Sequence, residues 1–193
     1  VEGMYEYVFD RCKRFGEAFV NTILSYIGIS RNGLRERDLE NLMKEYAKLK
    51  WDPLYFASLR RYLRNHIIQK GELGLWDFRH VKARESLIKG ILKNENDVIE
   101  LHKNLSSHLD KLNEEDPLRL SEIIWHLFKC DDKMKVAKIY GSIQNADNEQ
   151  TVSQYSNSIK DILLGRKNNI DWFFSILNDD KITDRIKQTM IRN

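Results

Sequence analysis

A change in the spacing of apolar residues between positions 66 and 78 constrains the fold of this chain more than any other feature. HIIQK (66–70) is short and β-branched, Gly71 and Glu72 reverse the chain, and LGLWDF (73–78) alternates apolar with small or polar side chains. A period of two on both sides of a glycine turn is typical of a β-hairpin. The sequence therefore predicts one hairpin, and helical spacing surrounds it on both sides.

Helical periodicity is clear before and after the hairpin, where apolar residues recur three and four positions apart. The fourth expected helix has the best-defined start, because Asp52 suits an N-cap and Pro53 suits the first helical position. The expected helices cover residues 4–14, 17–28 and 35–46, a segment that starts at residue 53, and residues 81–92.

Three helices followed by a β-hairpin are the element order of a winged helix. We therefore predict a winged-helix domain over residues 1–92, with the helix over 4–14 preceding it. The helix over 17–28 is nearly uncharged after Glu17, so we expect it to be the central core helix.

The remainder of the chain is predicted to be helical. Consecutive short amphipathic helices with short polar connections are typical of an α-solenoid. The fold class is therefore mainly α, and residues 93–193 are expected to form an α-solenoid-like array similar to tetratricopeptide repeats. The expected helix starts are Asp97, Asp116 with Pro117, and Asp131 with Asp132; a polar break at 144–150 precedes helices over about 151–164, 169–177 and 181–191.

Composition narrows the function classes. The 32 basic and 29 acidic side chains give a net charge of +3, which is too balanced to indicate nucleic acid by itself. Cys12 and Cys130 are far apart in sequence, which predicts reduced thiols and a reducing compartment such as the cytoplasm. No stretch reaches the roughly 18 apolar residues of a membrane span. The chain begins without Met inside an expected helix, so we expect a fragment of a longer protein.

No motif in the chain indicates catalysis. It has no GxxxxGK[ST] or GxGxxG phosphate loop and no HExxH sequence, so we expect no enzyme within it. His126 and Cys130 lie four positions apart on one expected helix and could share a metal ion. The alternative is that Cys130 packs in the protein while His126 faces solvent, and no metal site is predicted from two ligands.

Two groups of arginines are candidate DNA contacts, because a winged helix can place a helix in the major groove. The first group is Arg35 and Arg37, which lie among several carboxylates, and the second is Arg60, Arg61 and Arg64. Carboxylates oppose insertion between phosphates, and the overall charge is nearly balanced, so nucleic acid is not the expected partner.

The order of short motifs leads to a resemblance. ILSYIGISRNGLRERDLENLM (23–43) resembles the start of the winged helix in STAND NTPases, the signal-transducing ATPases with numerous domains. The nephrocystin and telomerase-associated-protein type and its bacterial relatives are the most similar group. That group has an SRxGL turn, a Trp-led helix and a hairpin ending F-x-H, matched here by residues 30–34, by Trp51, and by Phe78 with His80.

The resemblance extends into the second half of the chain. DPLRLSEIIWHLFKCDD (116–132) resembles the helix that opens the repeat region of these proteins. The similarity covers about residues 1–143, and residues 144–193 match only as helices. The NTPase module is absent from this chain and, on this resemblance, would precede Val1.

The resemblance implies a role for the histidine after the hairpin. In STAND proteins a histidine at this junction approaches the β-phosphate of ADP and holds the closed, inactive state. Plant resistance proteins have Met-His-Asp there, and this chain has Arg79, His80 and Val81, so the histidine is kept and the aspartate is not. Arg79 would add charge beside the phosphate. ATP and ADP would bind the intact protein, with no cofactor in this chain alone.

The resemblance also implies partners. The NTPase module would be bound in cis, the helical array would bind a partner protein in sensing or defence, and exchange of ADP for ATP would permit oligomerisation. Two alternatives remain open. One is a DNA-binding winged helix with a helical dimerisation or effector domain, and the other is a helical-repeat adaptor in which His80 caps backbone groups.

Overall fold

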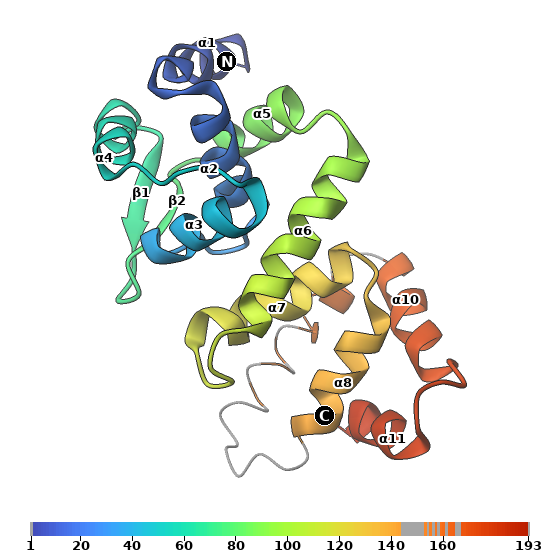
Figure 1. Cartoon of the computed structure of the whole chain (residues 1–193). Coiled ribbons are helices and arrows are strands. Elements are labelled where there is room, and N and C mark those ends of the chain that lie inside the picture. Colours follow the sequence, from blue (N-terminus) through green and yellow to red (C-terminus); the bar gives the residue numbers. More distant parts are fainter. Residues whose placement is uncertain are drawn as a thin grey trace. The chain divides into compact units, whose positions relative to one another are not determined.

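The computed structural model describes residues 2–143 and 167–192, and between these ranges residues 153, 155, 157, 159, 160 and 162–164. The chain divides into two compact units, Val1–His108 and Leu109–Asn193. The described residues are mainly helical, and their only sheet is a two-stranded antiparallel hairpin, which confirms these two predictions (Figure 1). The polar break expected at 144–150 lies outside the described residues.

The central helix of the first unit is α2 (Glu17–Ile29), as predicted. Nine of its residues are buried, from Phe19 to Ile29, and Glu17 is its one charged residue. Gly28 allows α5 (Val81–Ile91) to approach closely, because a Cβ at Gly28 would lie 2.9 Å from the Leu87 side chain. Packing of apolar side chains around α2 therefore forms the core of this unit.

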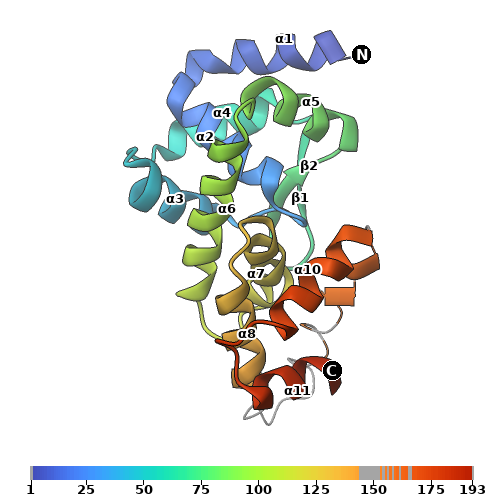
Figure 2. The ribbon, with the colours of Figure 1, turned by 90° about the vertical axis from the view of Figure 1, so that its right-hand side faces the viewer.

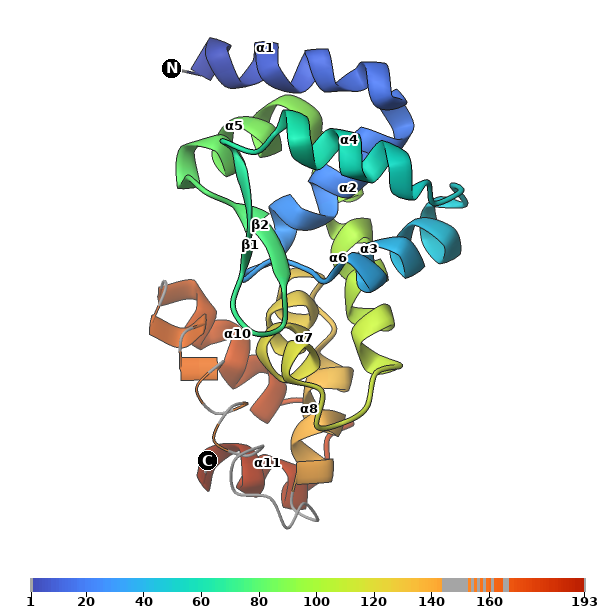
Figure 3. The same ribbon diagram turned by 90° about the vertical axis from the view of Figure 1, so that its left-hand side faces the viewer.

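The N-terminal helix α1 (Glu2–Cys12) and the 3₁₀ turn η1 (Lys13–Phe15) precede α2, and Gly16 at φ 94° separates them from it. Helix α1 packs along α5, as the views from opposite sides show (Figures 2 and 3). Tyr5, Phe9 and Cys12 are buried on its inner face. The Phe9 ring meets the Phe78 ring edge to face at 6.2 Å, which connects α1 to the hairpin.

Two helices lie between α2 and the hairpin. The first is α3 (Glu36–Leu42), which continues into a π-helical turn η2 (Met43–Ala47) and ends at Lys48 in a left-handed conformation. The second is α4 (Pro53–Tyr62). The predicted cap of α4 is confirmed, because the Asp52 carboxylate accepts hydrogen bonds from two backbone amides of the first turn and Pro53 follows it.

The predicted hairpin consists of β1 (Ile67–Lys70) and β2 (Leu75–Phe78), with Ile67 opposite Phe78 (Figure 3). Leu34 forms an isolated antiparallel bridge to Trp76, with hydrogen bonds of 2.8 and 3.1 Å in the two directions. Gly33 at φ 95° makes this approach possible, because a Cβ there would collide with the Trp76 carbonyl. A short segment before α3 therefore pairs with β2.

The first unit extends beyond the boundary expected at residue 92, because most of α6 (Glu95–Asp110) packs within it. The Asn104 side chain bonds to the Tyr26 hydroxyl, and His108 bonds to Asp38. The N-cap expected at Asp97 lies three residues too late, since the Asn94 side-chain carbonyl accepts from the Asn96 amide and the helix begins at Glu95. Helical periodicity alone does not reveal which unit a helix packs against.

The second unit contains α7 (Pro117–Lys129), α8 (Lys133–Ile143), α10 (Lys167–Leu177) and α11 (Asp184–Arg192). Helix α8 contacts the other three. Asp116 and Asp132 accept backbone hydrogen bonds at the starts of α7 and α8, as their sequence positions predicted. No helix within the described ranges is long and apolar enough to cross a membrane.

Candidate site at the junction of the hairpin and α5

His80 lies where β2 ends and α5 begins. The Arg79 amide donates to the His66 carbonyl at 2.7 Å, which extends the strand pairing by one residue. His80 then takes the N-cap position with extended backbone, and its carbonyl accepts from the Ala83 amide at 3.0 Å. Its imidazole makes no capping hydrogen bond and is exposed, so the ring itself is not used to start the helix.

A buried carboxylate holds this junction in place. The Asp77 side chain is 6% exposed and accepts from the Phe78 amide at 2.7 Å, from Lys70 Nζ at 2.6 Å and from the Arg84 guanidinium. Arg84 also donates to the carbonyl of Ser30, the residue that follows α2. Three elements therefore meet at the Arg84–Asp77 pair, and together they set the position of the first turn of α5.

A second imidazole lies near the first. His66 is half-buried, its ring meets the Tyr5 ring edge to face at 5.7 Å, and its buried Nδ1 has no hydrogen-bond partner among the described residues. Burial, and after it the charge of nearby His80, lower the pKa of His66 below its ordinary value of 6.5. Its surroundings therefore favour the neutral form of the His66 imidazole.

The two residues beside His80 are exposed. On one side is Arg79, so its guanidinium and the His80 imidazole lie next to each other on the surface at the start of α5. Both can donate hydrogen bonds to a phosphate oxygen. Val81, the residue after His80, is 72% exposed. The acidic residue that lies at this junction is Asp77, and it pairs with Arg84.

Three of the arginines predicted as alternative DNA contacts, Arg60, Arg61 and Arg64, lie on and just after α4. Arg60 lies over the Phe56 and Trp76 rings, 4.9 Å from each centroid, and pairs with Glu36 at 3.5 Å. Arg61 and Arg64 are exposed.

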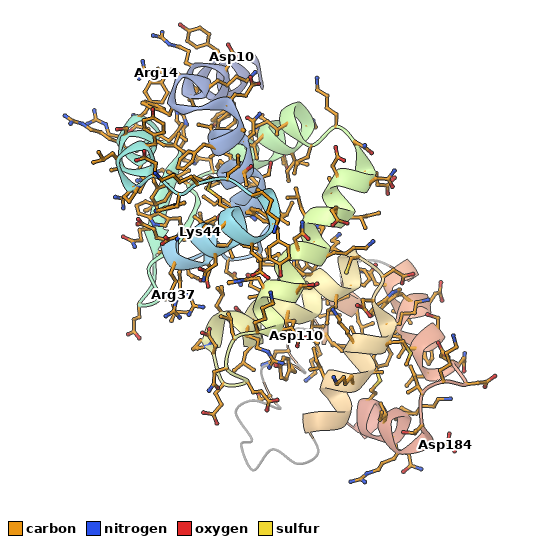
Figure 4. The ribbon with its side chains drawn as sticks, viewed as in Figure 1. Asp10, Arg14, Arg37, Lys44, Asp110 and Asp184 are labelled. Atoms are coloured by element: carbon orange, nitrogen blue, oxygen red, sulfur yellow. The ribbon has the colours of Figure 1, made fainter. Side chains whose placement is uncertain are left out.

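In the other candidate pair, Arg35 is buried, and its Nε donates to Asp38 at 2.5 Å. Arg37 is exposed on the surface of α3 (Figure 4).

The two residues of the candidate metal pair, His126 and Cys130, have different surroundings. His126 is fully buried, contrary to the solvated alternative, and its Nε2 lies 3.1 Å from the Glu122 carboxylate, which is also fully buried. The Cys130 thiol donates weakly to the Leu127 carbonyl. No group of three or more His, Cys, Asp or Glu side chains in the described part of the chain could hold a metal ion.

The residues that sequence reasoning missed at this site are His66, Asp77 and Arg84. Strand register could have indicated His66, because it occupies the position opposite Arg79 once the hairpin is aligned. Nothing in the local sequence indicates that Arg84 reaches Ser30, which lies 54 positions earlier.

Comparisons with known proteins add no relative. No protein-family model, no curated protein and no solved structure matches the chain.

Proposed function

We propose that this chain is a non-catalytic regulatory part of a STAND-type signalling ATPase. The first unit acts as a winged helix that closes over an NTPase module of the intact protein. His80 donates a hydrogen bond to the phosphate of bound ADP, and Arg79 adds positive charge. Release of this contact when ATP replaces ADP opens the protein and permits oligomerisation.

The proposal depends on one observation, which is that His80 has a fixed backbone and an exposed imidazole. Its backbone is fixed by the strand pairing and by the cap of α5, and the Arg84–Asp77 pair holds that helix against β2. Its imidazole is nevertheless exposed and makes no capping hydrogen bond. A fixed backbone with an imidazole that is not used as a cap is what recognition of a separate phosphate requires.

The element order supports the same proposal. Helix α2, the bridge at Leu34, helices α3 and α4, and strands β1 and β2 follow one another in the order of a winged helix. In the second unit, α7 and α8 form a helix pair joined by a short connection, which suits the start of a partner-binding helical arm. Neither Cys12 nor Cys130 forms a disulfide, which suits a reducing compartment such as the cytoplasm.

The gene that encodes the intact protein provides the first test. We expect its upstream part to encode a GxxxxGK[ST] phosphate loop, and the purified intact protein to retain ADP in a stoichiometric amount. An intact protein that lacks a phosphate loop and contains no nucleotide would overturn the proposal.

DNA binding is a second candidate function, because α4 exposes a surface without carboxylates. The helix contains no Asp or Glu, and Tyr55, Arg61 and Arg64 at and just after it are exposed. A gel-shift titration with duplex DNA at increasing salt tests this candidate. Binding that weakens steeply with salt and is lost on replacing Arg61 and Arg64 with Ala would favour DNA over a nucleotide switch.

A further inference from the structure

A cleft of about 520 Å³ lies between α1, α2 and α5, within the first unit. This volume falls within the range of roughly 300–1,000 Å³ that small-molecule sites occupy. The residues that line it do not include His66, Arg79 or His80. The cleft is therefore a second feature of the first unit, and a ligand bound there would be independent of the proposed nucleotide switch.

The floor of the cleft is mainly apolar, with the buried hydroxyl of Ser86 as a polar group. Phe9 and Leu87 line it and are buried, Ile91 is half-buried, and the Tyr7 ring at the rim is 61% exposed. Gly90 of α5 also lines the cleft, and a Cβ there would meet no atom within 4 Å. The absence of a side chain at Gly90 thus keeps part of the cleft open, at a cost of about 1 kcal/mol in helix stability relative to alanine.

The rim is positively charged. Among the described residues, Lys13, Lys89 and Lys93 line the cleft together with the Asp10 carboxylate on α1 (Figure 4). Lys13 pairs with Asp10 at 3.1 Å and with Glu17 at 3.2 Å, so its charge is balanced locally. The described lining residues carry more positive than negative side chains, and Lys89 and Lys93 lie on and just after α5.

We propose that this cleft binds a small organic anion. The apolar or aromatic body of the ligand packs against Phe9, Leu87 and Ile91, and its acidic group lies near Lys89 and Lys93. An apolar floor with a few charged groups at one side is the arrangement that orients an amphipathic ligand. The side-chain amide of Asn21, which lines the same cleft, supplies a neutral hydrogen-bonding group.

Fluorescence titration of the 193-residue chain with 8-anilinonaphthalene-1-sulfonate tests the proposal, with laurate as a competing anion and dodecanol as its uncharged counterpart. We expect saturable binding that laurate reverses and dodecanol reverses less well. Replacing both Lys89 and Lys93 with Ala should weaken binding about fivefold, because each exposed charge contributes modestly. The matched control is Lys82→Ala, an exposed lysine of α5 outside the cleft, which should bind as the parent does.

Substitutions at Gly90 locate the ligand. Gly90→Trp fills the open space and should abolish binding, whereas Gly90→Ala should preserve it and raise the thermal midpoint. In amide NMR spectra of the parent chain, the Gly90 amide and Asn21 side-chain signals should shift during titration with laurate. The proposal is overturned if the double lysine variant binds like Lys82→Ala, or if neither signal shifts, and the latter result does not depend on any variant folding.

Discussion

The imidazole of His108 and the carboxylate of Asp38 are 70 positions apart in sequence, and their nearest N and O atoms are 2.9 Å apart. Both side chains are buried, at 4% and 1% exposure. The other Asp38 oxygen accepts from Arg35 at 2.5 Å, so a single carboxylate of α3 receives both partners. This pair joins α6 to the first unit, which extends as far as residue 108.

Removal of His108 should destabilise the first unit. His108→Ala leaves Asp38 with Arg35 but without one of its buried donors, and we expect a loss of about 2 kcal/mol in the free energy of unfolding. Urea denaturation followed by circular dichroism measures it. The matched control is His80→Ala, an exposed histidine, which should change the free energy by less than about 0.5 kcal/mol. Equal effects of the two substitutions would contradict a stabilising role for the contact between His108 and Asp38.

The Asp38–His108 pair should also make the free energy of unfolding of the first unit depend on pH. Burial alone would raise the pKa of Asp38, but hydrogen bonds from His108 and Arg35 outweigh it and lower the pKa below 3.8. A carboxyl group with a lowered pKa in the folded state stabilises the protein above its unfolded pKa of about 3.9, and this contribution is lost as pH falls through the folded pKa.

Urea midpoints measured between about pH 6 and pH 3 test this dependence. The parent should lose stability as the pH falls below about 4, and Asp38→Asn should be less stable at about pH 6 but show a shallower decline. A decline of equal steepness in both proteins would show that other carboxylates are responsible.

Gly33 should tolerate substitution much less well than Gly71. Both have positive φ, 95° and 62°, but a Cβ at Gly33 would collide with the Trp76 backbone whereas one at Gly71 meets nothing within 4 Å. We expect Gly33→Ala to cost more than about 2 kcal/mol and Gly71→Ala about 1 kcal/mol. Thermal unfolding compares them, and a Gly33 variant as stable as the Gly71 variant would refute the bridge at Leu34.

The two thiols should react at different rates. Cys12 is fully buried, and burial raises its pKa to about 12, so it presents almost no thiolate near neutral pH. Cys130 is half-buried. We expect one thiol per chain to react with Ellman's reagent in the folded protein and the second only after unfolding. In Cys130→Ser the fast phase should disappear, and a fast phase that persists would place Cys12 at the surface.

Local patterns predict the hairpin and several helix starts, but they do not predict which elements contact one another. Asp52, Asp116 and Asp132 were identified as helix caps from sequence, because a cap acts over about three residues. The Asp38–His108 contact is set by tertiary packing and has no local signature. His80 was found because a strand–helix junction is a local feature.

For His126, the local sequence predicts neither its burial nor its hydrogen-bond partner. Its position four residues from Cys130 suggested either a metal ligand or a solvated side chain, and its actual partner is the buried Glu122 on the preceding turn. Glutamate and histidine four positions apart on a helix commonly form an exposed pair. Only the burial of both side chains distinguishes the Glu122–His126 pair from such an exposed pair.

Calorimetric titration of the intact protein with ADP, before and after His80→Ala, tests whether His80 recognises the nucleotide phosphate. One hydrogen bond to a charged phosphate contributes about 1.5 kcal/mol, so we expect roughly tenfold weaker ADP binding and higher basal activity in the variant. Lys82→Ala, an exposed neighbour on α5, should leave both unchanged. A His80→Ala variant that binds ADP as tightly as the parent would contradict the proposed switch.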